Sequence, residues 1–210
     1  MNKLSTLVRC LSASLILLHS LSFAQSIDAQ HLLKKRLNQL KTFQAEFSQK
    51  VSDAHNTVLQ EGNGQIVLQY PNQLYWRLNP PNENVLVADG KTLWQLDPFM
   101  EQVVALNQQA AIDNNPLILL TNPDDDAWQD YTISENNNEF VIRPKNQQGE
   151  IAQLILRFAD AHLIAMQIID GQQQVSDLHF TQIKQNQAVD QSLFAFKIPQ
   201  GYELDDQRTP

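Results

Sequence analysis

The sequence contains a single cysteine, Cys10, close to its amino terminus. Residues 25–210 contain none, which excludes disulfides, thiolate metal sites and cysteine nucleophiles from that part of the chain. Arg9 precedes Cys10 in place of the small residue that lipid attachment to a cysteine requires, so we expect no lipid modification. The folded part of the chain must therefore be held together by packing alone.

Local catalytic and metal-binding motifs are also missing. No Gly-x-Ser-x-Gly, phosphate-binding glycine loop or dinucleotide fingerprint occurs. The histidines beyond residue 24 are too scattered for a zinc motif: His31, His55, His162 and His179. Asp124-Asp125-Asp126 lacks the spaced ligands of a calcium loop and is interpreted as a solvated turn with a capping role. The sequence predicts no enzyme, cofactor or metal, unless a site assembles from residues without local motifs.

The sequence contains no long apolar run, and its most apolar stretch is a short one near the amino terminus. Lys3 and Arg9 precede the apolar residues 11–18, and small or polar residues follow as far as Ala24. This order predicts a secretory signal peptide, residues 1–24, cleaved after Ala24. The stretch is shorter than the roughly 20 apolar residues of a membrane helix. We expect residues 25–210 to form one soluble, exported domain.

Basic residues are scarce relative to acidic ones. The chain has 15 Lys and Arg against 23 Asp and Glu, and removing residues 1–24 takes away two basic residues and no acidic one. Residues 25–210 therefore carry a net charge of about −10, which makes nucleic acid a poor partner. The acidity suits a carrier with apolar surface that must stay soluble, or a protein that docks on a basic partner.

The periodicity predicts one helix followed by a sheet. Leucines recur at helical spacing from Asp28, a candidate N-cap, to Lys41, and strict alternation begins at Phe43. No long helix separates the later alternating segments, so the sheet is expected to be antiparallel. About eleven strands are predicted, near 43–51, 57–70, 73–79, 84–88, 92–97, 101–106, 128–134, 138–143, 150–158, 162–169 and 174–184.

Two connections stand out between these strands. Asp89-Gly90 is typical of a tight type I′ hairpin turn. Residues 107–127 break the alternation with Pro116-Leu117-Ile118-Leu119-Leu120, which predicts a loop with one or two short helices. Five consecutive apolar residues need burial, and the open face of the sheet is the nearest cover for them. We expect this segment to form a lid.

Aromatic and aliphatic residues gather on the predicted strands. Leu74, Trp76 and Leu78 alternate on one face, and Phe43 and Phe47 do so on another strand. An ordinary β-sandwich core would account for this composition. A single curved sheet covered by one helix and one lid would instead leave more apolar surface than its covers can fill, and that arrangement predicts a ligand cavity.

Several motifs resemble those of the periplasmic outer-membrane lipoprotein carriers, over essentially all of residues 25–210. The fold implied by the resemblance is mainly β with a few helices: an incomplete β-barrel of one coiled antiparallel sheet, covered by an amino-terminal helix and a helical lid. The matching stretches are Phe43-Gln-Ala-Glu-Phe47-Ser-Gln49-Lys50-Val51, Gln60-Glu61-Gly62-x-Gly64, Pro71-Asn72-Gln-Leu-Tyr-Trp76, Val87-Ala-Asp89-Gly90-Lys91-Thr92-Leu93-Trp94, Pro98-Phe99-Met-Glu101-Gln102, Asn115-Pro116, Phe194-x-Phe196-x-x-Pro199-Gln-Gly201 and Asp205-Asp206-Gln207.

The resemblance implies a monomeric periplasmic carrier. Such a protein would take acylated lipoproteins from an inner-membrane ABC transporter and pass them to an outer-membrane lipoprotein receptor. Where the family commonly has a lid-latching arginine, this chain has Tyr70, a candidate weaker latch. The residues implied to line the acyl-chain cavity are Phe43, Phe47, Val51, Leu74, Trp76, Leu86, Leu117 and Leu120.

Two alternative functions are open, and the first of them, a sensor domain, has a similar fold. A lipoprotein-sensing regulatory domain would usually be joined to a further domain, whereas this sequence ends at Pro210. An outer-membrane receptor would need a lipidated amino-terminal cysteine, which Cys10 behind Arg9 does not provide.

Overall fold

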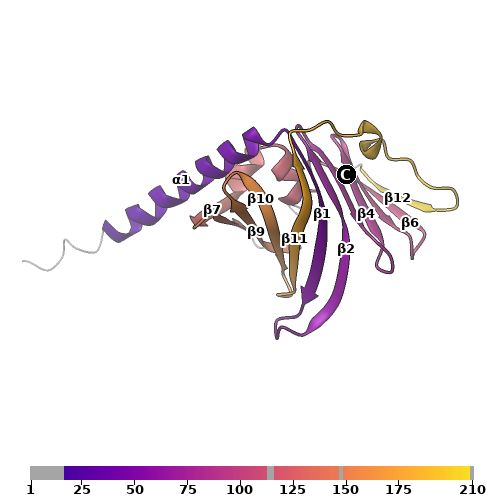
Figure 1. Ribbon diagram of the computed structural model, residues 1–210, viewed down its shortest axis with the longest axis horizontal. Helices are drawn as coiled ribbons and strands as arrows, with labels where there is room; N and C mark the ends of the chain where they lie inside the picture. The colour runs from indigo at the N-terminus through magenta and orange to yellow at the C-terminus, as the bar shows by residue number, and fades with distance from the viewer. Residues whose placement is uncertain (1–16, 113–115, 147–148, 209–210) are drawn as a thin grey trace, which may run out of the picture.

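The computed structural model describes residues 17–112, 116–146 and 149–208, and within them the chain forms one large curled sheet with a long helix beside it (Figure 1). The elements in chain order are α1 (Leu17–Gln39), β1 (Thr42–Ser52), β2 (Val58–Gln69), β3 (Gln73–Leu78), β4 (Asn84–Asp89), β5 (Thr92–Asp97), β6 (Gln102–Asn107), the 3-10 helices η1 (Pro116–Thr121) and η2 (Asp126–Asp130), β7 (Tyr131–Asn136), β8 (Glu139–Pro144), β9 (Ile151–Ala159), β10 (His162–Asp170), β11 (Val175–Gln185), η3 (Gln191–Phe194) and β12 (Glu203–Gln207).

The described residues contain twelve strands in the order β12-β6-β5-β4-β3-β2-β1-β11-β10-β9-β8-β7. This confirms the predicted single curled sheet and eleven of its strands. β12 was not predicted, and it pairs with β6 in parallel, so the expectation of a purely antiparallel sheet is wrong at this edge. The strand predicted from 128 begins at Tyr131, because η2 occupies the residues before it.

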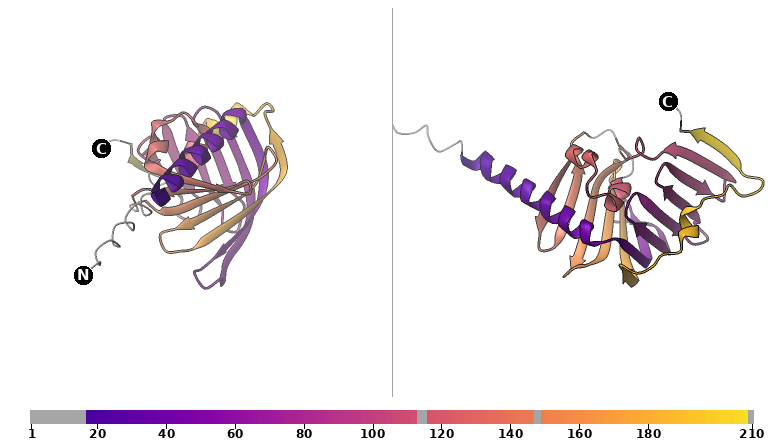
Figure 2. Two further views of the ribbon diagram at one scale, coloured as in Figure 1. Left: turned by 90° about the vertical axis from the view of Figure 1, so that its left-hand side faces the viewer. Right: turned by 90° about the horizontal axis from the view of Figure 1, so that it is seen from above.

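Helix α1 runs across the β7 side of the sheet (Figures 1 and 2) and packs against β7. Leu33 and Leu37 are fully buried, as their helical spacing predicts. The helix begins at Leu17, so Asp28 lies within it and the predicted N-cap there is wrong. Residues 17–27 contain no glycine or proline that would stop the helix, and it ends at Gln39, two residues before the predicted Lys41.

The predicted signal peptide remains a prediction. Residues 1–16, which include Lys3, Arg9 and Cys10, lie outside the described residues. Cleavage after Ala24 would remove about two turns from the start of α1. No helix among the described residues is long and apolar enough to cross a membrane.

The segment between β6 and β7, which we call the lid, contains two short 3-10 helices in its described residues, as predicted. Leu117, Ile118, Leu119 and Leu120 of η1 are all buried, and η1 packs on β2 and β3. The carboxylate of Asp125 accepts a hydrogen bond from the amide of Ala127 at 2.9 Å and caps η2. This confirms a capping role in the Asp124–Asp126 stretch.

The turn between β4 and β5 differs from the predicted type I′ turn. That turn needs positive φ at both central residues, but only Gly90 has it, with φ of 100°. Asp89 instead accepts hydrogen bonds from the amides of Lys91 and Thr92, at 2.9 and 2.8 Å, and from Trp94 Nε1 at 2.9 Å. The side chain of Asp89 therefore pairs with amides in this turn, as aspartate often does where the backbone does not form a tighter turn.

Asp89 predicts a pH dependence of stability. Burial raises its pKa, but the hydrogen bonds from Thr92, Trp94 and Lys91 together outweigh burial and leave the pKa below its ordinary value. A pKa lowered by folding stabilises the protein above the ordinary value, and this contribution is lost as the pH falls through the folded-state pKa. We expect the difference in unfolding free energy between wild type and Asp89→Asn, measured in urea, to shrink from pH 7 to pH 3. A constant difference would show that the charge of Asp89 contributes nothing.

The carboxy-terminal segment covers the outer face of the sheet and returns to its edge as β12 (Figure 2). η3 packs on β3 and β4, and Phe194 is buried. Phe196 stacks on Trp94 with the ring centroids 5.0 Å apart. Trp94 is therefore part of an outer packing layer, whereas Trp76 faces the other side of the sheet.

Candidate functional site

The inner face of the sheet carries rows of apolar side chains that strand pairing sets side by side. Directly paired residues project to the same face, and residues two apart along one strand share that face. Two rows cross β1, β2, β3 and β4 in this way: Phe43, Leu68, Leu74 and Ala88 form the first, and Ala45, Ile66, Trp76 and Leu86 form the second.

Aromatic contacts tie the strands of this face together. The rings of Phe47 and Trp76 have centroids 4.4 Å apart, and Phe43 meets Phe180 edge-on at 5.3 Å. Gly64 pairs with Phe47 across β1 and β2, and a Cβ at Gly64 would lie 2.5 Å from Phe47 Cζ. The absence of a side chain at Gly64 therefore makes room for the Phe47 ring.

The lid covers these rows through η1, which packs on β2 and β3, and the helix lies against β7 on the other side of the same cluster. Leu117, Ile118, Leu119 and Leu120 of η1 belong to the same buried cluster as the sheet residues, together with Leu33 and Leu37 of α1. We call this cluster the apolar interior. In the structure as it stands, side chains of the protein itself occupy this interior.

The structure brings together seven of the eight residues expected to line a cavity. Phe43, Phe47, Leu74, Trp76, Leu117 and Leu120 are buried in the apolar interior, and Leu86 packs against it half-buried. Val51 is half-buried and lies outside the cluster, towards the far end of β1. Contact with a ligand stays a prediction for all eight.

A second half of the interior went unrecognised in the sequence. Phe140, Leu156, Met166 and Leu178 form a row across β8, β9, β10 and β11, and all four are buried. Alternation in these strands was visible, but nothing local indicates which face turns inward. Only the pairing of β11 with β1 joins this row to the residues that carry the family resemblance.

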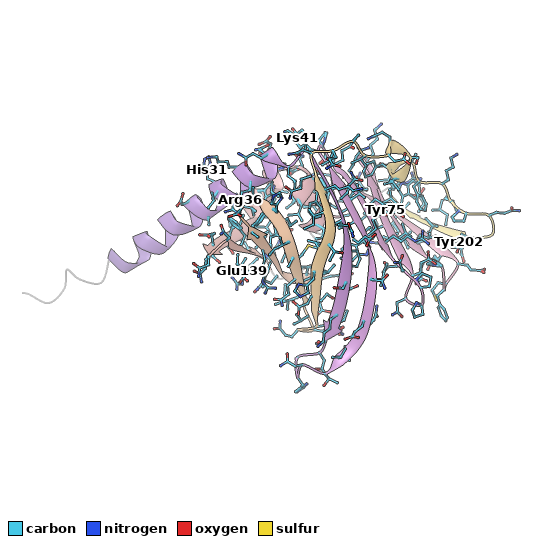
Figure 3. The ribbon with its side chains drawn as sticks, in the orientation of Figure 1. His31, Arg36, Lys41, Tyr75, Glu139 and Tyr202 are labelled. Atoms are coloured by element: carbon cyan, nitrogen blue, oxygen red, sulfur yellow. The ribbon has the colours of Figure 1, made fainter. Side chains whose placement is uncertain are left out.

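Arg36 fastens the helix to this second half. Its guanidinium lies over the rings of Phe140 and Phe158, at 5.3 and 4.9 Å from their centroids. It also donates hydrogen bonds to the carbonyl of Asp160 and to the side chain of Asn138. Figure 3 shows Arg36 where α1 meets the sheet. Cation–π contacts and charged hydrogen bonds thus position the helix over the interior.

Tyr70, the candidate latch, points to a different neighbour. Lys41 Nζ lies 4.4 Å from the centroid of its ring, and its amide donates to the carbonyl of Lys41 at 2.9 Å. Among the described residues its hydroxyl makes no hydrogen bond to the lid. Other groups hold the lid: the amide of Asn72 donates to the carbonyl of Thr121 at 3.2 Å, and the Tyr131 hydroxyl donates to the carbonyl of Ile112 at 3.2 Å.

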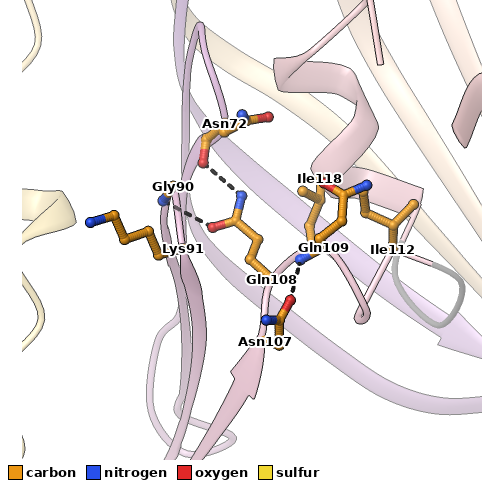
Figure 4. Close-up of a pocket in the computed structure, with 8 residues that line it drawn as sticks. All are labelled: Asn72, Gly90, Lys91, Asn107, Gln108, Gln109, Ile112 and Ile118. Carbon is orange, nitrogen blue, oxygen red and sulfur yellow. Dashed lines mark hydrogen bonds between the residues drawn. The ribbon is translucent and has the colours of Figure 1, made fainter. Parts of the chain in front are cut away.

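A pocket of about 240 Å³ opens at the base of the lid (Figure 4). Gln108, a polar residue that sequence reasoning missed, spans it: its side chain donates to the carbonyl of Asn72 at 2.8 Å and accepts from the amide of Gly90 at 2.9 Å. The residues that line the pocket are Asn72, Gly90, Lys91, Asn107, Gln108, Gln109, Ile112 and Ile118. Within the described ranges no group of three or more metal-ligating side chains gathers.

Comparisons with known proteins agree on one family. A family model described as "Outer membrane lipoprotein carrier protein LolA" matches residues 38–197. An outer-membrane lipoprotein carrier protein of Shewanella halifaxensis is 36% identical over 190 residues, which cover 90% of each chain. One from Cronobacter sakazakii is 37% identical over 182 residues, 86% of this chain and 89% of the relative.

A solved structure of a LolA superfamily protein from Nitrosomonas europaea covers 79% of this chain and 96% of its own, with a TM-score of 0.46 and 12% identity. A likeness this distant adds nothing to the family assignment, which rests on the family match and on the identity to the curated relatives. On those two grounds the chain belongs to the LolA family of outer membrane lipoprotein carrier proteins.

Proposed function

We propose that this protein is a periplasmic carrier that shields the acyl chains of lipoproteins. The observation that carries the proposal is the apolar interior, in which the inner face of the sheet meets the leucines of a separate lid segment. Each CH₂ group of an acyl chain gains roughly 0.8 kcal/mol on leaving water, so chains do not cross an aqueous space unshielded at a useful rate. The carrier names of its relatives support the same role.

The filled interior suggests how such a carrier binds and still releases its cargo. Because η1 packs on β2 and β3, an acyl chain that enters between the lid and the sheet must displace Leu117 and Leu120. When the chain leaves, the lid leucines take its place and the inner face is not left exposed to water. The net affinity is then a difference between two burials of similar size, which keeps binding reversible.

The partners belong to the same proposal. The carrier, a monomer without cofactor or catalytic activity, receives cargo from an inner-membrane ABC transporter that releases lipoproteins. It delivers this cargo to an outer-membrane lipoprotein receptor.

To test the carrier role, the protein is purified from a periplasmic extract and the co-purifying molecules are identified by mass spectrometry. Triacylated or diacylated peptides support the proposal, and their absence from protein isolated while lipoprotein export is active contradicts it.

The net charge of about −10 on residues 25–210 predicts that delivery depends on salt. Exposed charges are screened over about 10 Å at 0.1 M ionic strength, so an acidic carrier should bind a basic docking surface less tightly as salt is added. We expect the association rate with the purified receptor to fall about tenfold between 20 and 300 mM salt, as measured by surface plasmon resonance. A rate that does not change with salt contradicts a charge-guided encounter.

A further inference from the structure

The turn between β2 and β3 is connected to both ends of the first half of the lid. The carbonyl of Asn72 accepts a hydrogen bond from Gln108, the residue that follows β6, and the amide of Asn72 donates to the carbonyl of Thr121, the last residue of η1. A single turn residue thus joins Gln108 and Thr121, which lie thirteen positions apart in the sequence.

Gln108 is the buried member of this arrangement. Only 4% of its surface is exposed, and its amide uses a donor towards Asn72 and its acceptor towards Gly90. Its own backbone amide donates to the carbonyl of Lys91 at 2.9 Å. Figure 4 shows the side chain reaching between two turns that belong to different hairpins. A buried amide bonded on both sides specifies one geometry, because any other leaves polar groups unpaired.

We propose that Gln108, acting through the backbone of Asn72, is the residue that positions the lid in its closed state and sets how fast cargo is released. The part that concerns cargo release rests on the proposed carrier function, and the part that concerns the lid position does not. Tyr70, the candidate latch, has Lys41 Nζ 4.4 Å from the centroid of its ring, and among the described residues its hydroxyl makes no hydrogen bond to the lid. Two residues after Tyr70, the backbone of Asn72 makes the bond to the lid carbonyl, and Gln108 holds that backbone in place.

The test replaces Gln108 by glutamate and uses Gln109→Glu as its matched control. A carboxylate at position 108 can still accept from the amide of Gly90, but it cannot donate to Asn72 and places an oxygen against that carbonyl. Gln109 is exposed, so the same change of charge one residue later leaves the arrangement intact. Hydrogen exchange of the Asn72 amide, followed by NMR without ligand, should be about tenfold faster in Gln108→Glu and unchanged in Gln109→Glu.

A second variant, Gln108→Met, keeps the shape of the side chain and removes both hydrogen bonds. Here the amides of Asn72 and Gly90 should both exchange faster, whereas in Gln108→Glu only the former should. Urea unfolding identifies a variant that has simply lost its fold. If the Asn72 amide exchanges at the wild-type rate in both variants, Gln108 does not position the lid.

Release of cargo is measured separately, by stopped-flow displacement of a fluorescent acylated peptide. We expect release to be about tenfold faster from Gln108→Glu than from wild type or Gln109→Glu. Faster exchange with unchanged release would limit Gln108 to lid geometry and overturn its role in release. Failure of the wild type to bind the peptide at all would contradict the carrier function, and the exchange data would still decide whether Gln108 holds the lid.

Discussion

Replacing Trp76 by glutamate should lower the affinity for an acylated peptide by roughly 100-fold. Trp76 lies on the inner face against Phe47, and only 6% of its surface is exposed. Glutamate there would place a carboxyl group without a hydrogen-bonding partner beside the bound acyl chain. We expect this to reduce the binding free energy by about 3 kcal/mol. Isothermal titration calorimetry with the acylated peptide measures the loss without relying on tryptophan fluorescence.

Trp94→Glu is the comparison, because Trp94 faces the outer side of the sheet. It stacks on Phe196 and donates to Asp89, on the face of the sheet opposite to the rows that include Trp76. Both variants should lose stability, since each introduces a charge into packed surroundings, so affinities are compared only for the folded fraction in each case. Equal losses of affinity in the two variants would show that Trp76 has no special part in ligand binding.

Gly64→Ala should reduce the free energy of unfolding by about 3 kcal/mol, measured by urea denaturation. An added methyl group would overlap the carbonyl of Arg77, which belongs to the backbone of β3, and would lie 2.5 Å from Phe47 Cζ. Neither neighbour can give way cheaply, since one is part of a strand pair and the other is packed on Trp76.

Gly62→Ala provides the matched control on the same strand. The nearest atom to its added methyl group is Leu78 Cδ1 at 3.1 Å, the end of a flexible side chain. Alanine is also favoured over glycine in a strand by up to about 1 kcal/mol, so the net change should be small. Similar losses at Gly62 and Gly64 would mean that contact with the Arg77 backbone and Phe47 is not what requires glycine at position 64.

The strands could be predicted from the sequence because most of them pair with strands that are adjacent in the sequence. β1 to β6 are joined by short connections, so each strand pairs with its neighbour in the sequence, and alternation alone predicts both the strands and their order. The lid was predicted for a related reason, because five apolar residues between strands need to be buried. The failures were at longer range: β12 pairs with β6 in parallel across about a hundred residues, and no local pattern marks such a partner.

The site shows the same division. The family resemblance pointed to Phe43, Phe47, Leu74 and Trp76, and the register of β1, β2 and β3 sets them on one face. It also offered Tyr70 as a candidate weaker latch, which stays a prediction, because contact between a side chain and the lid depends on the tertiary fold. Gln108 could not be singled out from sequence, since adjacent glutamines at positions 108 and 109 look alike until the fold buries one and exposes the other.

The sequence by itself therefore determined the absence of cysteine chemistry after residue 24, the strand pattern and the apolar lid segment, and the export signal stays a prediction. These properties depend on composition and on periods of two to four residues. The tertiary structure decided that β12 pairs with β6 at one edge of the sheet, and that Gln108 is buried while Gln109 is exposed. These outcomes depend on contacts between residues that are distant in the sequence. Such contacts form only in the folded protein, with the sheet curled and the lid packed on it.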